Sequence, residues 1–482
     1  MNPTTAPAAA KQGLFTPPIP FDSQKPWSNW GGNQTATPAY TVRPRNDQEA
    51  LEAVRFAINE GLPVRAVGAG HSFTPLVQTG GVLMDLSAIT GVTGTDTAKK
   101  RARAKGGTAI SAFGDALWER GLGLSNQGDI DKQSISGAIA TGTHGSGIDL
   151  GCFSSSLRWV RLINGHGEIV EIGEDQLREL RAAQVALGTL GIFLEVELEV
   201  VDRYHLQEQI TYPTWDQTLA TWDQDIANNR HYSFLWCHGE ESAGLYELPT
   251  PAGELMANRS YTKRYNPVSV EEPSGISLAE GSRRDRSYRI YPGGFMIPFH
   301  ELEYYVPAER GREAVEAVQD LMRTVHPDQM YPIEVRWVKQ DDGYISPFYK
   351  RDTTVISVSG APGTNYWPYL RDVDAVLVPR AAVRLRWRRG AGAGAVPQQP
   401  RARHGERDRR CVDAERQLGC GRPLHRLWGA DAGRRGRRRV VPGRGGRVGC
   451  ASGRPALDDD GLPLTDAVCL LRVRRRIGGT GR

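Results

Sequence analysis

Cysteine is scarce in this sequence: there are six among 482 residues, and no two of them form a Cys-x-x-Cys pair. Disulfide frameworks and cysteine-based metal sites need more numerous or more closely spaced cysteines. The sequence therefore excludes a disulfide-stapled fold and predicts no metal site. Sparse thiols of this kind are typical of a reducing compartment, which predicts a cytoplasmic protein.

Long apolar runs are absent as well. No stretch approaches the roughly 20 residues that a transmembrane helix needs, so we expect no transmembrane segment. The first 25 residues lack the basic start and apolar stretch of a secretory signal. With 39% hydrophobic and 24% charged residues, the composition is that of a globular protein. Peripheral association with a membrane stays open.

The C-terminal segment lacks five residue types. From Arg380 to Arg482 there is no Phe, Tyr, Met, Asn or Lys, whereas there are 26 Arg and nine acidic residues. One explanation is a disordered, basic nucleic-acid-binding arm, but such arms usually mix Lys with Arg. GC-rich codons give Arg, Gly, Ala, Pro and Val in almost any frame. We therefore favour a shift of the reading frame near Val378, with residues 379–482 an irregular tail and no nucleic-acid partner.

Helical and strand patterns alternate before residue 203. Asn46 followed by Glu49 marks the start of a helix, and Leu51, Val54 and Ile58 form its apolar face. The same patterns predict a strand at 63–67, a helix at 110–120, a hairpin at 157–172 and a strand at 192–201. Together they predict an α+β domain over residues 37–203.

A glycine-rich loop, Gly68-Ala69-Gly70-His71-Ser72, directly follows the predicted strand 63–67. Glycines let consecutive backbone N–H groups approach an anion such as a pyrophosphate, and Ser72 adds a hydroxyl donor. Phe73 stands where the dinucleotide fingerprint has its third glycine. A simple turn with a surface histidine explains this loop equally well.

Two further segments are rich in small residues. Residues 136–147 form one, and residues 187–192, with the sequence Leu-Gly-Thr-Leu-Gly-Ile, form the other. Taken singly, each is explained by a tight turn beside a sheet. The residues that we single out in them are Gly137, Thr141, Gly142, His144, Gly188, Gly191 and Ile192.

In this order and spacing, the three segments resemble the FAD-binding domain of the vanillyl-alcohol oxidase superfamily, and most of all its sugar-1,4-lactone and alditol oxidase group. The resemblance covers roughly residues 28–377. It implies an N-terminal extension (1–36), a two-subdomain FAD-binding domain (37–203) and an α+β substrate-binding cap domain (204–378).

The resemblance also implies how FAD is held. His71 falls on the family's covalent attachment point for the flavin, with Gly68, Ala69, Gly70 and Ser72 around the pyrophosphate. The singled-out residues of segments 136–147 and 187–192 match the second cofactor loop and the segment near the adenine. Relatives with a second covalent bond have a cysteine in the loop that here contains Asp129, so we expect one bond, to His71.

Substrate handling is expected from a strand at 331–338, where period two places Glu334 and Arg336 on one face. An exposed ion pair explains that pattern equally well. The resemblance implies instead that Glu334 accepts hydrogen bonds from substrate hydroxyls. Arg336 then supplies positive charge near the developing alkoxide or the reduced flavin. His300, in a strand-like segment beside the pocket, is expected to be structural.

The implied activity is FAD-dependent oxidation of a sugar 1,4-lactone or alditol hydroxyl, with hydride passing to flavin N5. Reoxidation by oxygen gives hydrogen peroxide, as in D-arabinono-1,4-lactone oxidase, and the small Gly106 favours oxygen access. The family closes its active site with a C-terminal His-Trp-Gly-Lys stretch, which is absent here because the last lysine is Lys350. Two alternatives stay open: an FAD-binding chain impaired in turnover, and a dehydrogenase that uses another electron acceptor.

Overall fold

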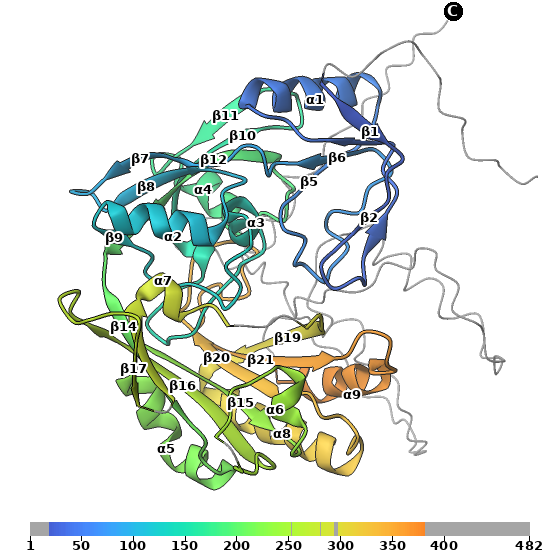
Figure 1. Ribbon diagram of the computed structural model, residues 1–482. Helices are drawn as coiled ribbons and strands as arrows, with labels where there is room; N and C mark the ends of the chain where they lie inside the picture. The colour runs from blue at the N-terminus through green and yellow to red at the C-terminus, as the bar shows by residue number, and fades with distance from the viewer. Residues whose placement is uncertain (1–18, 252, 280, 294–296, 381–482) are drawn as a thin grey trace, which may run out of the picture. The chain divides into compact units, whose positions relative to one another are not determined.

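The computed structural model describes residues 19–251, 253–279, 281–293 and 297–380 (Figure 1). All of them belong to one compact unit, residues 1–392. The tail predicted at 379–482 lies outside the described residues except for its first two positions. Within the described ranges, no helix combines the length and the apolar character needed to cross a membrane. Three main sheets and their helices make an α+β fold, which confirms the predicted class.

The first sheet is covered by α1, the helix predicted from Asn46 and Glu49. The side chain of Asn46 accepts a hydrogen bond from the Glu49 backbone N–H at 2.9 Å, so the predicted cap is present. Leu51 and Val54 pack against Val82 and other apolar residues of the sheet. The strand order is β1-β4-β6-β5, and β4 and β5 both run parallel to β6. The elements are β1 (Phe21–Ser23), β4 (Tyr40–Val42), α1 (Asp47–Asn59), β5 (Val64–Val67) and β6 (Val82–Asp85), beside the small pair β2 (Trp27–Ser28) and β3 (Thr35–Ala36).

The second sheet is antiparallel, with the order β11-β10-β12-β8-β7. It contains the predicted hairpin, whose strands pair from Val160 with Ile172 to Ile163 with Ile169. Helices α2 and α3 share its apolar core. The elements are β7 (Val92–Asp96), β8 (Arg101–Lys105), α2 (Ile110–Glu119), α3 (Ile135–Ala140), β10 (Leu157–Ile163), β11 (Ile169–Ile172), α4 (Leu177–Ala183) and β12 (Ile192–Glu199), with the small pair β9 (Leu122–Gly123) and β13 (Val201–Asp202).

The third sheet has eight strands in the order β17-β18-β14-β16-β15-β20-β21-β19. Neighbouring strands in the described part of this sheet pair antiparallel. Its strands are β14 (His205–Thr211), β15 (His231–Cys237), β16 (Arg259–Val268), β17 (Ile276–Ala279), β18 (Ser282–Arg286), β19 (His300–Pro307), β20 (Ile333–Val338) and β21 (Thr353–Gly360). The helices that follow or connect them are α5 (Trp215–Asn228), α6 (Ser242–Leu245), α7 (Ser287–Ile290), α8 (Gly311–Thr324) and α9 (Trp367–Leu377).

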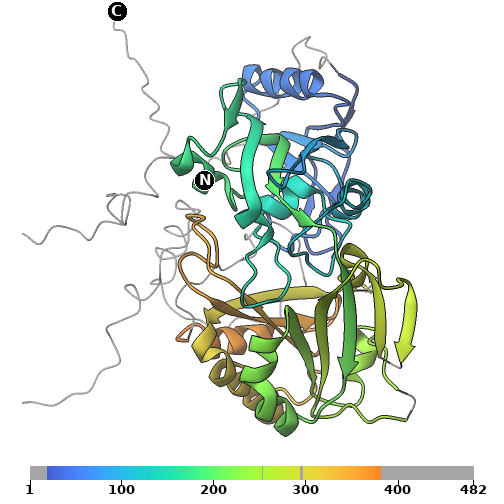
Figure 2. The ribbon, with the colours of Figure 1, turned by 90° about the vertical axis from the view of Figure 1, so that its left-hand side faces the viewer.

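The two faces of the eight-stranded sheet differ in chemistry. On β20, Val335 and Trp337 belong to an apolar core that α5, α8 and α9 complete on one side of the sheet (Figures 1 and 2). Because side chains alternate along a strand, Glu334 and Arg336 point to the opposite face. That face meets the first half of the chain, where Gly147 N–H donates to the Trp337 carbonyl at 2.7 Å. The strand alternation thus presents charged groups to the first half.

The apolar face can be tested on α8. Val318 is fully buried in this core, whereas Val325, just past the end of α8, is 56% exposed. Val318→Ala should lower the free energy of unfolding by about 2 kcal/mol, because it removes buried methyl groups and leaves a cavity. The matched change Val325→Ala should alter it by less than about 0.5 kcal/mol. Urea unfolding of the two variants measures both, and equal effects would contradict the described packing.

Candidate active site

The first glycine-rich loop is held from one side by residues 29–34. The carbonyls of Ser72 and Phe73 accept side-chain hydrogen bonds from Asn29 at 3.0 Å and from Gln34 at 2.8 Å. Trp30 N–H donates to the Gly70 carbonyl at 2.8 Å. Residues 29–34 lie in the predicted N-terminal extension, for which the sequence suggested no role. They fix the loop by its carbonyl groups.

The same loop keeps its donors available. Within the described residues, none of the backbone N–H groups from Ala69 to Ser72 has a hydrogen-bond acceptor. Donors without an internal acceptor, on a loop whose carbonyls are held elsewhere, suit a phosphate group. His71 is partly buried against Trp30, with ring centroids 5.2 Å apart, and burial lowers the pKa of His71. The donor set of this loop therefore fits the diphosphate of FAD.

The structure brings the three glycine-rich segments together. A Cβ on Gly68 would lie 2.1 Å from the Ser134 Oγ, so only glycine lets the first loop approach the start of α3. Leu187 N–H donates to the Ala140 carbonyl at 2.9 Å, which joins the third segment to the second. The predicted cofactor residues in these segments are thus neighbours in space, with one partial exception, His144, described below.

Gly106 also has a packing role. A Cβ at this position would lie 2.3 Å from the Phe193 carbonyl oxygen of β12. Gly191 is restricted in the same way, with φ +137° and a Cβ position 2.0 Å from the Ile163 carbonyl oxygen. Backbone contact therefore accounts for the glycine at 106, and its small size is not by itself a sign of oxygen access.

Glu334 and Arg336 are paired, and Glu334 is buried while Arg336 is mostly buried. The Arg336 Nε donates to Glu334 Oε1 at 2.9 Å, and a second hydrogen bond joins Arg336 NH2 to Glu334 Oε2. Glu334 is only 5% exposed. Burial by itself would lower the pKa of Arg336, but Glu334 and Asp129 outweigh it and raise that pKa. The alternative explanation, an exposed ion pair, is therefore wrong.

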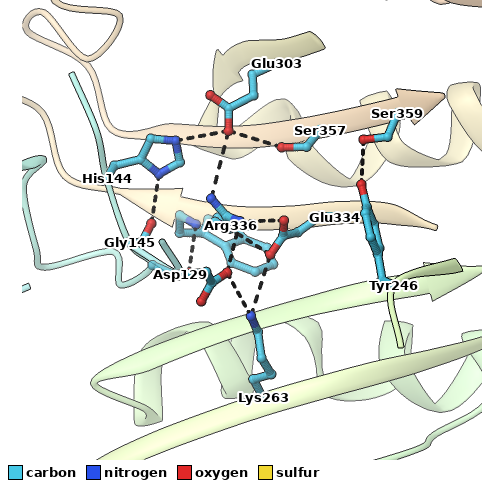
Figure 3. A network of polar contacts seen from close by, with 12 residues as sticks. Asp129, His144, Gly145, Tyr246, Lys263, Glu303, Glu334, Arg336, Ser357 and Ser359 are labelled. Atoms are coloured by element: carbon cyan, nitrogen blue, oxygen red, sulfur yellow. Dashed lines mark hydrogen bonds and ion pairs between the residues drawn. The ribbon is translucent and has the colours of Figure 1, made fainter. Parts of the chain in front are cut away.

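Asp129 joins this pair from the loop that precedes α3 (Figure 3). Its Oδ2 lies 3.1 Å from Arg336 NH2 and 3.1 Å from Lys263 Nζ of β16. Burial favours the neutral acid, yet the two cations lower the pKa of Asp129. Lys263 also forms an ion pair with Glu334 Oε1 at 3.6 Å. The charged groups thus come from the loop before α3, from β16 and from β20.

Glu303 on β19 completes the cluster on its other side. Its Oε1 lies 3.3 Å from His144 Nε2 and 3.9 Å from Arg336 NH1, and it accepts a hydrogen bond from Ser357 at 3.2 Å. His144, predicted beside the cofactor, therefore contacts the substrate half as well. Burial opposes ionisation of Glu303, but His144 and Arg336 lower its pKa. Glu301, two residues earlier, has a raised pKa because of burial and the nearby Glu303.

A cavity opens beside Asp129, Lys263 and Arg336. Its wall combines charged and hydroxyl-bearing side chains with aromatic rings. The remaining residues that line it are Gly145, Ser146, His231, Ser233, Tyr265 and Tyr291. Its free space, about 10 Å³, is that of roughly one water molecule, so the wall can receive a single hydroxyl or carbonyl oxygen of a ligand. Groups of three or more possible metal-ligating side chains are absent from the described part of the chain.

Comparison with known proteins identifies the family. Residues 38–173 match the FAD binding domain family, and residues 255–378 match the D-arabinono-1,4-lactone oxidase family. The chain is 33% identical over 372 residues to L-gulono-1,4-lactone dehydrogenase of Mycobacterium tuberculosis, covering 73% of this chain and 86% of that protein. The chain belongs to the sugar-lactone and alditol oxidase group of FAD-binding oxidoreductases. It therefore has an FAD-binding domain and is an FAD-dependent oxidoreductase of sugar lactones or alditols.

More distant similarities agree with this membership. L-gulonolactone oxidase of Bos taurus is 26% identical, with 72% of this chain and 83% of that protein covered. The solved structure of cholesterol oxidase from B. sterolicum superposes with a TM-score of 0.62 at 14% identity, over 79% of this chain and 86% of that chain. The structural likeness supports the same overall fold.

Sequence reasoning missed three charged residues of the site. Lys263 shares one face of β16 with Tyr261 and Tyr265, and period two in that strand was the available signal. Glu303 stands two residues from Glu301 in a segment considered only for His300. His300 contacts the Gly31 carbonyl at 2.6 Å and the hydroxyl of Tyr366, contacts that fit the predicted structural role. Asp129 has no local signal, because its partners are distant in sequence.

Replacing Glu301 or Glu303 of β19 with glutamine should have opposite effects on stability. The pKa of Glu301 is raised from 4.5 to about 8, so the folded chain binds this proton more tightly than the unfolded chain. The free energy of unfolding should then fall as pH rises from 4.5 to 8, by up to about 1.4 kcal/mol per pH unit. Glu301→Gln should therefore stabilise the protein at pH 8 more than at pH 5.

Thermal unfolding of Glu301→Gln and wild type at both pH values measures this difference. The matched control is Glu303→Gln, which removes the carboxylate partner of His144 and Arg336 and should lower the melting temperature at pH 7 and above. If Glu301→Gln gave the same shift at pH 5 and pH 8, Glu301 would not carry the raised pKa.

Proposed function

We propose that this protein oxidises a hydroxyl group of a sugar 1,4-lactone, as a D-arabinono-1,4-lactone oxidase does, with oxygen as the acceptor and hydrogen peroxide as the product. The observation that carries this proposal is the buried Arg336 beside a polar cavity, in a chain whose residues 255–378 match the D-arabinono-1,4-lactone oxidase family. Alditols share the hydroxyl chemistry and are the second substrate class.

FAD, when bound, supplies the two-electron acceptor for a hydride from the substrate carbon. For its diphosphate we propose the backbone N–H groups of the loop that contains Gly68, Ala69, Gly70 and Ser72. Within the described residues, the N–H groups from Ala69 to Ser72 have no hydrogen-bond acceptor. We propose His71 as the covalent attachment point. Its lowered pKa supports this role, since a neutral imidazole has a free nitrogen lone pair. The further cofactor contacts proposed are Gly137, Thr141, Gly142, His144, Gly188, Gly191 and Ile192.

Arg336 is the proposed electrostatic catalyst. Its Nε and NH2 groups are held by Glu334 and Asp129, whereas NH1 makes no hydrogen bond within the described residues. Among the described residues NH1 has only a long ion pair with Glu303, at 3.9 Å, so this fixed guanidinium can donate from NH1 to the substrate oxygen as negative charge develops there. Glu334 positions the guanidinium and is the proposed acceptor for a neighbouring hydroxyl. The hydroxyl proton then leaves to water or to a polar group of the cavity.

The electron acceptor separates two candidates. The relative from Mycobacterium tuberculosis is named a dehydrogenase, which favours an acceptor other than oxygen. The relative from Bos taurus is named an oxidase. A third candidate, an FAD-binding chain impaired in turnover, is favoured by the absence of the C-terminal His-Trp-Gly-Lys stretch from the sequence.

One experiment distinguishes all three candidates. Anaerobic addition of D-arabinono-1,4-lactone, L-gulono-1,4-lactone or xylitol should bleach the flavin absorbance, and air should then restore it with formation of hydrogen peroxide. Bleaching that only dichlorophenolindophenol reverses would identify a dehydrogenase. No bleaching by any of the substrates would contradict the proposed activity. Arg336→Lys should slow bleaching about 100-fold, whereas Arg103→Lys, at an exposed pair with Glu197, should not.

Covalent attachment is tested by denaturation. After acid precipitation the flavin of the wild-type protein should stay in the pellet, and His71→Ala should release it to the supernatant. His166→Ala, in the exposed hairpin turn, is the matched control and should behave as wild type. Flavin in the supernatant of the wild-type sample would show that the cofactor is bound without a covalent link.

A further inference from the structure

We propose that Lys263 is a substrate-contacting residue, whose ammonium donates a hydrogen bond to a hydroxyl or carbonyl oxygen of the sugar lactone. This assignment rests on the proposed function and extends it, because it names the group that recognises the substrate beside Arg336. No sequence pattern had predicted a role for Lys263.

Strand pairing places Lys263 in one row with Arg336. Ser233 of β15 is the direct partner of Lys263 on one side and of Arg336 on the other. Directly paired residues point to the same face of a sheet, so the two cations flank Ser233 on the face opposite the helices. All three residues line the cavity.

Lys263 retains unused donors. An ammonium group has three N–H bonds, and within the described residues the one hydrogen bond that Lys263 Nζ donates is to Asp129 Oδ2 at 3.1 Å. The second carboxylate, of Glu334, lies at 3.6 Å, an ion-pair distance and not a hydrogen bond. Lys263 is 7% exposed, so water outside the protein cannot satisfy these donors freely. A ligand oxygen in the cavity can.

The charges around Lys263 favour a neutral ligand. Two cations, Lys263 and Arg336, face three carboxylates, those of Asp129, Glu334 and Glu303. An anionic substrate would therefore gain no net attraction, while a lactone or polyol can use donors and acceptors of both signs. The neutral groups of the wall agree: burial raises the pKa of Tyr265 and Tyr291 well above the ordinary value, so both phenols keep their protons.

Lys263 also bears on the absence of a lysine from the C-terminal part of the sequence. The resemblance implies that a C-terminal His-Trp-Gly-Lys stretch closes the active site, and the sequence has no lysine after Lys350. Lys263 comes from a different strand, yet it carries the same functional group at the wall of the cavity. A chain without the C-terminal lysine thus still has a buried ammonium for its substrate.

The test compares variants in which every buried charge keeps a partner of opposite charge. Lys263→Met by itself leaves Asp129 short of one cation and can unfold the chain. We therefore compare Asp129→Asn with the double variant Asp129→Asn/Lys263→Met, both as full-length holoprotein. Anaerobic calorimetric titration with L-gulono-1,4-lactone gives the dissociation constant, while flavin content and melting temperature report on the fold.

The double variant should bind the lactone at least about tenfold more weakly than Asp129→Asn, the loss expected for a charge-assisted hydrogen bond. Flavin content should not change. The control Lys99→Met, at an exposed lysine, should bind as wild type. Equal affinities of the single and double variants would overturn the assignment of Lys263 and leave the proposed function standing. If wild-type protein bound neither the lactone nor xylitol, the proposed function would fail, and the assignment with it.

Discussion

The guanidinium of Arg336 is the interaction on which the site depends. It is buried, and a buried charge is stable only when it is paired and hydrogen-bonded. Its carboxylate partners come from the loop that carries Asp129, from its own strand at Glu334 and from β19 at Glu303. Glu334 on the same strand makes two hydrogen bonds to the guanidinium, and the two distant segments add Asp129 and Glu303. The full set of carboxylates therefore forms only when the loop that carries Asp129 meets the eight-stranded sheet.

Close backbone contact is the second constraint. Gly68, Gly106 and Gly191 each occupy a position where a Cβ would collide with Ser134 or with a backbone carbonyl. Gly68 thereby brings the first loop close to the start of α3, while Gly106 and Gly191 allow close backbone contacts with Phe193 and Ile163. The two roles are compatible, since a loop fixed by its carbonyls keeps its N–H groups free for a phosphate.

Local patterns predicted much of the fold correctly. The Asn46 cap, the hairpin at 157–172 and the alternation around Glu334 all depend on residues close in sequence. Periodicity also placed Glu334 and Arg336 on one face. It could not predict whether that face is exposed to solvent, because burial depends on what packs over the strand. For the same reason the sequence did not predict a role for Lys263, which is buried only because distant segments cover β16.

The sequence by itself determined the α+β class, the order of the glycine-rich segments, and through them the family and its cofactor. Only the tertiary structure decided which charges meet. Asp129 and Arg336 are 207 positions apart, and Asp129 and Lys263 are 134 apart. The reason is physical: helix caps, turns and strand periods are set by neighbours in the chain. Compensation of buried charge is instead set by neighbours in space, and these exist only once the sheet is covered.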